Sequence, residues 1–341
     1  MSSEEFQDFD VFEEHTTDCA NVNTGGEAEG VSTGDSGVAS SEADNQEKNE
    51  AFAQANNDAG NQLNNAATDK AVPADLQLDQ ESGSAASSSQ APHPYMAQNK
   101  SFARRTRHMN ESLEHTLEEH GKQYMIPVQP GIAPTAVAED SKPISYRKIF
   151  QRKALVRVEI GSGVGTQIVA AAHSHPDRDY IAFEVYRPGL AKTIRKAEAL
   201  GGLPNLKLIE ADAQQALRLL LPEASVDEVW TFFPDPWRKT RHHKRRLIQE
   251  DFARDVAYVL RPGGLWRIAT DWDDYAWSIR DVIESSAYFE NPYTGVNPDP
   301  RDPEGDRGGF APRWDNRVMT KFEHRGIEAG RTIHDIVGQR L

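Results

Sequence analysis

One carboxylate in this chain stands between two prolines and directly before the densest run of positive charge. The run reads FPDPW from Phe233 to Trp237 and continues as RKTRHHKRR over residues 238–246. Each proline ring fixes φ and removes an N–H, so the turn presents Asp235 from a rigid corner. Clustered cations favour a phosphate-rich ligand, and a carboxylate binds hydrogen-bond donors. The two features together predict a nucleic acid substrate.

A glycine-rich segment lies about seventy residues earlier, where Glu159 opens the sequence EIGSGVG. Gly161, Gly163 and Gly165 would let the backbone turn tightly and approach a ligand. A dinucleotide-binding loop would need its third glycine at position 166, which is a threonine. The spacing E-x-G-x-G-x-G instead resembles the first motif of class I S-adenosylmethionine methyltransferases, whose cationic cofactor suits nearby carboxylates.

Two further acids, Glu184 and Asp212, stand where successive strands should end. Glu184 follows the first acid at about the distance expected for a carboxylate that receives ribose hydroxyls. Asp212 is placed where such methyltransferases bind adenine. Taken singly, either acid could equally be a loop residue or a helix cap, but acids at successive strand ends favour a ligand site.

The pattern of apolar residues predicts an α/β fold. Strands are expected at 155–160, 181–185, 206–210, 226–233 and 265–270, with helices at about 165–174, 188–200, 213–221 and 244–260. This alternation is typical of a Rossmann-like, doubly wound and mostly parallel sheet with helices on both faces. Ligands of such sheets bind beyond the carboxyl ends of the strands.

The charge is divided unevenly along the chain. Residues 1–100 hold 19 of the 53 Asp and Glu and 3 of the 38 Lys and Arg, a net charge of −16, which leaves +1 for the remainder. Residues 1–98 hold too little apolar surface to fold and are expected to be a long disordered acidic tail, either a spacer or an interaction arm. Residues 99–145 would hold a basic arm with Arg104, Arg105 and Arg107, a helix from about 111 to 120 and a Pro-rich connector. The arm is either solvated or contacts phosphates. Residues 146–341 form the expected catalytic domain.

The composition also excludes several classes of protein. The single cysteine, Cys19, lies in the tail, so neither a disulfide nor a cysteine metal site is expected within the chain. The first residues lack the apolar segment of a secretory signal, and no apolar run reaches membrane-spanning length. A cytoplasmic, monomeric protein without membrane or metal is expected.

Combined, these motifs resemble the bacterial tRNA (guanine-N7-)-methyltransferases of the TrmB type. The resemblance covers residues from about 100 to 341 and is carried by FPDPW, by the basic run, by Thr270-Asp271-Trp272 with Tyr275, and by Thr320-Lys321-Phe322-Glu323 with Arg325-Gly326. It implies the class I methyltransferase fold, the cofactor S-adenosylmethionine, and methyl transfer to N7 of guanine 46 in the variable loop of tRNA. The sequence departs from the family pattern at Arg238, Thr240 and Arg331, where Pro, Lys and His are expected.

The resemblance also implies the site residues. Asp235 would be the catalytic residue. Cofactor contacts would come from Glu159, Gly161, Gly163, Gly165, Glu184, Asp212 and Asp235. Substrate contacts would come from Lys239, Asp271, Thr320, Lys321, Phe322 and Glu323. The RNA backbone would be bound by Arg241, His242, His243, Lys244, Arg245 and Arg246.

The chemistry agrees with these roles. Guanine N7 carries a lone pair and no proton, so the enzyme needs no general base and acts by orientation and exclusion of water. A carboxylate at Asp235 would hold guanine through its N1–H and amine and favour the positive charge that grows on the ring.

Simpler interpretations remain for several of these residues. Asp271 could be the N-cap of a helix that begins near Asp273, residues 320–323 could form an amphipathic strand, and residues 241–246 could be a solvated helix start. At least two of Trp237, Trp272 and Tyr275 are expected in the core. For the whole chain, the alternatives are a methyltransferase for another substrate and a non-catalytic RNA-binding protein of the same fold.

Overall fold

The structure is a computed structural model that describes residues 109–133, 135–305 and 307–341. The expected acidic tail and the arm with Arg104, Arg105 and Arg107 lie outside these residues. In the described part, no helix is long and apolar enough to cross a bilayer.

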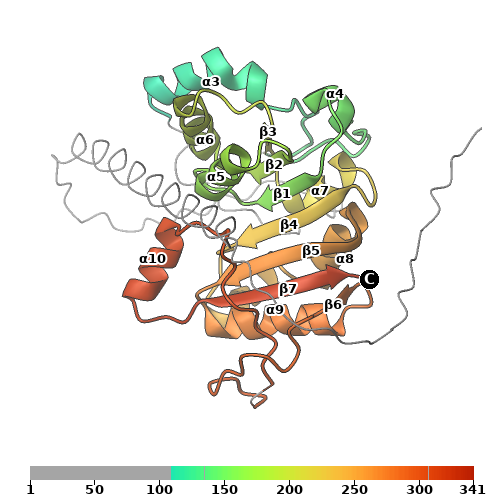
Figure 1. Ribbon diagram of the computed structural model, residues 1–341, viewed down its shortest axis with the longest axis vertical. Helices are drawn as coiled ribbons and strands as arrows, with labels where there is room; N and C mark the ends of the chain where they lie inside the picture. The colour runs from blue at the N-terminus through green and yellow to red at the C-terminus, as the bar shows by residue number, and fades with distance from the viewer. Residues whose placement is uncertain (1–108, 134, 306) are drawn as a thin grey trace, which may run out of the picture. The chain divides into compact units, whose positions relative to one another are not determined.

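The centre of the fold is a seven-stranded sheet in the order β3-β2-β1-β4-β5-β7-β6 (Figure 1). The strands are β1 (Val156–Ile160), β2 (Asp179–Glu184), β3 (Leu206–Glu210), β4 (Val226–Phe232), β5 (Leu260–Thr270), β6 (Phe289–Glu290) and β7 (His334–Arg340). The first five run parallel, and β7 pairs antiparallel with both β5 and β6. This confirms the predicted doubly wound, mostly parallel sheet, and it places the carboxyl ends of β1, β2, β4 and β5 at one edge.

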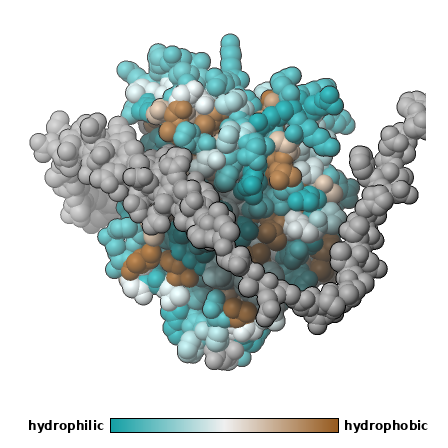
Figure 2. Space-filling model, viewed as in Figure 1, coloured by the Kyte–Doolittle hydropathy of each residue, from teal (hydrophilic) through white to brown (hydrophobic). Residues whose placement is uncertain are grey.

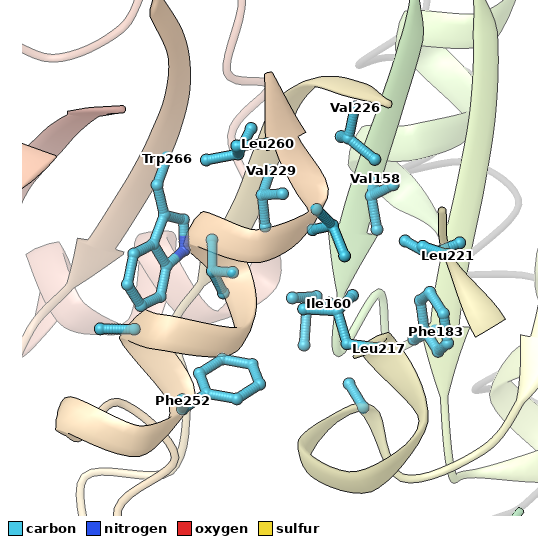
Figure 3. Packing of buried hydrophobic residues seen from close by; sticks show 14 of the residues in the cluster. Val158, Ile160, Phe183, Leu217, Leu221, Val226, Val229, Phe252, Leu260 and Trp266 are labelled. Carbon is cyan, nitrogen blue, oxygen red and sulfur yellow. The ribbon is translucent and has the colours of Figure 1, made fainter. Parts of the chain in front are cut away.

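Two apolar layers hold the helices to the sheet. On one face lie α7 (Ala213–Leu220), α8 (Glu250–Val259) and α9 (Asp273–Ser285), and on the other α3 (Glu111–Tyr124), α5 (Thr166–Ser174) and α6 (Arg187–Ala199). Figure 3 shows the first layer, with Val158, Ile160 and Val229 from the sheet facing Leu217 and Phe252 from the helices. The central strands are buried on both faces, which explains their unbroken apolar runs. On the face seen in Figure 2 the surface is mostly hydrophilic, with apolar groups in separate patches.

The helix expected at about 111–120 is α3, and its cap shows why it begins there. Asn110 accepts a hydrogen bond from Leu113 N at 3.0 Å, and Glu111 and Glu114 place negative charge in the first turn. The short α4 (Tyr146–Phe150) precedes β1 at the opposite edge of the sheet from the carboxyl ends (Figure 1). α10 (Lys321–Glu328) lies beyond the carboxyl edge, between β6 and β7 in the chain.

The predicted helix 244–260 is wrong in its first part. Residues Thr240–Arg245 form a separate 3-10 helix, η1, and α8 begins only at Glu250. Glu250 and Asp251 occupy the first turn of α8, where negative charge is favoured, whereas four basic side chains crowd the end of η1. The cations therefore precede the helix instead of opening it.

Candidate active site

The glycine segment after β1 forms a tight loop against β2 and α6. All three glycines have positive φ, at 72° for Gly161, 59° for Gly163 and 71° for Gly165. Gly161 N donates to Phe183 O at 2.8 Å, and a Cβ on Gly165 would lie 2.4 Å from the Thr193 side chain. Among the described residues, no atom would lie within 4 Å of a Cβ on Gly161 or Gly163. Within this part of the chain the loop is therefore packed against α6 on one side and open on the other.

Glu159, at the end of β1, is a buried acid with a free acceptor. In the described part of the chain its Oε2 has no hydrogen-bond partner, and neither has Ser162 Oγ. Burial raises the pKa of the Glu159 carboxyl to about 8, and the charge of Glu184 adds to this shift. Such a carboxylate suits a cationic ligand, which would supply the missing partner and offset the cost of burial.

Glu184, at the end of β2, is bound by the backbone. Its Oε2 accepts from Gly163 N at 2.6 Å, and its Oε1 accepts from Val185 N and Tyr186 N at 2.8 Å each. Burial raises its pKa, while these N–H groups oppose the rise and the Asp235 charge adds to it. The charge of Glu184 raises the pKa of Glu159, and the charge of Asp235 raises the pKa of Glu184. The three predicted acids therefore lie close to one another.

Asp212 follows β3 and caps α7. Its side chain accepts from Gln214 N at 3.0 Å, and its own N–H donates to Thr135 O of the Pro-rich connector at 2.8 Å. The helix-cap interpretation is thus confirmed, and the predicted adenine contact stays a prediction. The connector lies beside this edge of the sheet, which the sequence did not indicate.

The turn after β4 has a strained backbone on either side of its carboxylate. Phe233 and Trp237 have φ of 52° and 44°, a region that bulky residues rarely adopt. Asp235 between them is exposed, and partial desolvation of its carboxyl group by surrounding protein atoms raises its pKa. Non-glycine residues in this conformation persist only where the surroundings hold them, and they concentrate at functional sites.

Neighbouring residues restrain the turn at both of its ends. Ala269 O accepts from Phe233 N at 2.7 Å, and the buried Arg317 guanidinium lies 5.8 Å from the centre of the Phe233 ring. At the other end, Pro236 O accepts from Arg246 Nε at 3.0 Å.

The segment 238–246, which we call the basic ledge, is mostly accessible. The exposed members are Arg238, Lys239, Arg241, Lys244 and Arg245, while His242 and His243 are half-buried. The Arg238 guanidinium lies 4.5 Å from the centre of the Trp272 ring, and that of Arg245 lies 4.9 Å from the centre of the Trp237 ring. Arg246 differs from the rest because only 4% of its surface is exposed, so its predicted RNA contact has little accessible surface to support it.

Asp271, after β5, pairs with a residue that departs from the family pattern. Arg331 Nε donates to Asp271 Oδ2 at 2.8 Å. The interpretation of Asp271 as an N-cap is wrong, since the N-cap of α9 is Trp272 and no side chain bonds there. Tyr275 is fully buried and Trp272 packs against the core, as expected for at least two of the three aromatic residues.

Residues 320–323 form the start of α10, so the strand interpretation is wrong. Thr320 is the N-cap and accepts from Glu323 N at 3.2 Å, while Lys321 and Phe322 are exposed. Glu323 has no exposed surface, and its carboxylate is bound by Arg313 at 2.8 Å and Arg317 at 2.9 Å. Its predicted contact with substrate stays a prediction, and in this structure Glu323 supports two arginines.

These supporting residues were not found from the sequence. Arg317 also pairs with Asp335 of β7, and Gln167 of α5 bonds both Asn316 O at 3.0 Å and Val318 N at 2.8 Å. The partners of Gln167 lie 149 and 151 residues away in the chain, and single arginines and glutamines carry no local signal of such pairing. The segment before α10 is thereby fixed next to the helix that follows the glycine loop.

One group of metal-ligand type occurs in the described part, formed by Asp273, Asp299 and His334. The Arg301 guanidinium pairs with Asp273 at 2.8 Å and with Asp299 at 3.0 Å. A protein cation thus already pairs with both carboxylates, and the expectation that the chain needs no metal stays a prediction.

Comparison with known proteins places this site in a family. Residues 153–336 match the model of a family described as "Putative methyltransferase". A tRNA (guanine-N(7)-)-methyltransferase of Cutibacterium acnes is 44% identical over 241 residues, covering 71% of this chain and 83% of the relative. That of Paenarthrobacter aurescens is 41% identical, covering 69% and 89%. Among solved structures, the 16S rRNA methyltransferase KamB has a TM-score of 0.41 at 18% identity, covering 61% of this chain and 98% of that one. On its sequence, this chain belongs to the tRNA (guanine-N(7)-)-methyltransferase family.

Proposed function

We propose that the protein transfers a methyl group from S-adenosylmethionine to N7 of a guanine in tRNA. The observation that carries the proposal is the Asp235 turn, where a strained backbone holds an exposed carboxylate between the buried acid Glu184 and the basic ledge. A small substrate would have no use for the ledge, and a scaffold protein would have no use for the buried Glu159 Oε2, which has no hydrogen-bond partner in the described part of the chain. The names of the relatives support the same conclusion.

The cofactor-facing residues fit a sulfonium nucleotide. Within residues 109–133, 135–305 and 307–341, Glu159 offers a buried oxygen without a partner, and Gly161 and Gly163 leave the space beside the loop open. We assign the cationic end of the cofactor to Glu159, the ribose to Glu184 and the adenine to Asp212. When bound, S-adenosylmethionine supplies an activated methyl group on sulfur.

The protein contributes position and charge. The Asp235 carboxylate accepts hydrogen bonds from guanine N1–H and the exocyclic amine, which leaves N7 free to point at the methyl donor. N7 has no proton to lose, so the Asp235 carboxylate serves donor recognition and charge stabilisation, not proton abstraction. Asp271, held by Arg331, would be the second contact to the base, together with Lys239 of the ledge and Thr320, Lys321 and Phe322 at the start of α10.

The ledge serves the RNA backbone. Its exposed cations are suited to phosphates, which RNA presents together with unstacked bases in loops. The target at guanine 46 of the variable loop, the monomeric state and the cytoplasmic location rest on the family resemblance and the sequence, and we include them in the proposal.

Methyl transfer from labelled S-adenosylmethionine into unmodified tRNA, followed by nucleoside analysis, tests the function. We expect 7-methylguanosine as the product, and a loss of turnover by at least about 100-fold in Asp235→Ala, since removing one charged contact to the reacting base has effects of this order. Asp235→Asn, which has the same shape, should also lose most activity because its amide carries no charge and places an NH2 donor, instead of a second acceptor oxygen, opposite one of the two guanine donors.

The alternatives predict other results. Methylation of a different atom or of a small molecule would assign the site to another methyltransferase activity. Failure to bind S-adenosylmethionine at micromolar concentration would favour the non-catalytic RNA-binding protein. Full activity of Asp235→Ala would remove Asp235 from the reaction.

A further inference from the structure

Arg246 has the sequence context of an RNA contact but the surroundings of a structural residue. It ends the basic ledge, yet its side chain is almost wholly enclosed. Arg245, its direct neighbour in the chain, is exposed. Because the two differ in accessibility and not in charge, the pair separates the two roles that an arginine could have here.

The guanidinium of Arg246 joins three elements. Its Nε donates to Pro236 O at 3.0 Å, its Nη2 donates to Asp274 Oδ2 at 2.7 Å, and the same Nη2 lies 3.1 Å from His243 Nε2. The Cζ atom of Arg246 lies 4.7 Å from the centre of the buried Tyr275 ring. The side chain thus connects the turn after β4, the 3-10 helix η1 and the first turn of α9.

Two of the three elements carry residues with assigned roles, and the third begins close to one. The turn carries Asp235, η1 carries the ledge cations, and α9 begins two residues after Asp271. A planar guanidinium with donors in fixed directions suits such a junction, whereas an ammonium acts as a compact point charge.

The turn needs an external support. Pro234 and Pro236 have no N–H, so two of its residues can donate no backbone hydrogen bond. The turn is also held between residues of positive φ, a conformation that relaxes when its surroundings are removed. A hydrogen bond to Pro236 O, one residue after Asp235, restrains the turn directly beside the carboxylate.

We infer that Arg246 is a positioning residue that fixes Asp235 through the Pro236 carbonyl and couples the catalytic turn to the basic ledge. This inference rests on the proposed role of Asp235 and replaces the expected RNA contact of Arg246. A misplaced reacting group by about 1 Å costs on the order of 100-fold in rate, so we expect a loss of this size in kcat for Arg246→Ala.

The test compares Arg246→Ala, Arg246→Lys and Arg245→Ala in the full-length protein. For each, kcat and KM for tRNA are measured, together with the dissociation constant of tRNA as a function of salt. If Arg246 is a positioning residue, Arg246→Ala lowers kcat about 100-fold. The slope of log K against log[salt], where K is the association constant for tRNA, stays that of the wild type. Arg246→Lys keeps the charge and should restore only a small part of kcat. Arg245→Ala should instead weaken binding and reduce the slope by about 0.7–0.9, the value of one phosphate contact.

A double-mutant cycle separates positioning from general damage to the fold. If Arg246 acts through Asp235, then Arg246→Ala has little further effect on the single-turnover rate in an Asp235→Ala background. Independent losses in the two variants, full rescue by Arg246→Lys, or a reduced salt slope in Arg246→Ala would each overturn the inference. Absence of 7-methylguanosine with the wild-type protein would count against the proposed function instead, and the salt slopes, which need no turnover, would still decide whether Arg246 contacts RNA.

Discussion

The Glu159 carboxyl is costly to ionise in the free protein. Its pKa is raised from 4.5 to about 8 by burial and by Glu184, while the nearby Lys196, whose own pKa burial lowers to about 8, opposes the rise. An acid with a raised folded-state pKa stabilises the fold fully below its unfolded pKa, and this contribution is lost as the pH rises from about 4.5 to about 8. The free protein should therefore lose stability across this range through this one group.

We expect Glu159→Gln, which keeps the shape of the side chain and removes its charge, to reverse that loss. Relative to the wild type, the free energy of unfolding of the variant should change by less than about 1 kcal/mol near pH 5 and should be higher by about 2–4 kcal/mol near pH 8.5. Urea unfolding of both proteins without cofactor, at a series of pH values, measures the difference. Equal gains at both pH values would mean that Glu159 is ionised throughout.

The same substitution separates a structural acid from a cofactor ligand. Because a bound cation favours the carboxylate, the affinity for S-adenosylmethionine in the wild type should rise with pH up to about 8, by at most tenfold per pH unit. In Glu159→Gln the affinity should be lower and this dependence should disappear. Calorimetric titration measures both the affinity and its pH dependence. An unchanged pH dependence in Glu159→Gln would mean that another residue binds the cationic end of the cofactor.

The acids at strand ends could be predicted from sequence because each follows a recognisable apolar run. Glu159, Glu184 and Asp235 meet at one edge since parallel strands end together. The burial of Arg246 and of Glu323 could not be predicted in this way. Their partners come from other elements of the fold, and the residue type alone does not show whether an arginine or glutamate side chain is solvated or enclosed.

At the level of elements, strands were easier to predict than the connections between them. Strands buried on both faces leave an unbroken apolar run, whereas η1 was merged with α8 because charge spacing does not distinguish a 3-10 turn from an α-helix. The predicted helix that follows β2 was right within one residue at each end, since α6 spans Arg187–Ala199. Its fit to the glycine loop depends on a contact that only the structure shows.

That contact predicts a difference between two glycine substitutions. A Cβ at Gly189 in α6 would lie 2.2 Å from Gly163 O, a backbone atom that cannot move without moving the loop, whereas at Gly121 in α3 the nearest atom would be 3.9 Å away. We expect Gly189→Ala to destabilise the protein by about 1–3 kcal/mol despite a better helix propensity, and to weaken S-adenosylmethionine binding at least about tenfold. Gly121→Ala, the matched control, should be neutral or stabilise by up to about 1 kcal/mol.

Denaturant midpoints and cofactor titrations of the two variants provide the comparison. If Gly189→Ala binds the cofactor like the wild type, then α6 does not set the shape of the loop. If both variants are destabilised alike, the cause is a general intolerance of these helices and not the approach of α6 to Gly163.

For the molecule as a whole, net charge is a poor guide to the substrate. The chain carries −15, but residues 101–341 are nearly neutral, and six of their 35 Lys and Arg lie within the basic ledge. The class of fold followed from the alternation of strands and helices. The structure of the long segment between β6 and α10 could not be predicted from this alternation, because ion pairs hold the segment in place. Examples are Arg280 with Asp302 and Arg307 with Glu284.

The position of charge, not its total, should govern RNA binding. Arg241→Ala with Lys244→Ala removes two cations from the ledge, and Lys148→Ala with Lys153→Ala removes two from the opposite edge, in α4 and just before β1. Both double variants change the net charge equally. We expect the ledge variant to lower the slope of log K against log[salt] for tRNA by about 1.5 and the control variant to leave it unchanged, because only neutralised phosphates release counterions. Equal slopes in both would show that tRNA responds to the overall field of the protein, and a loss confined to the control would place the RNA at the amino edge of the sheet, away from Asp235.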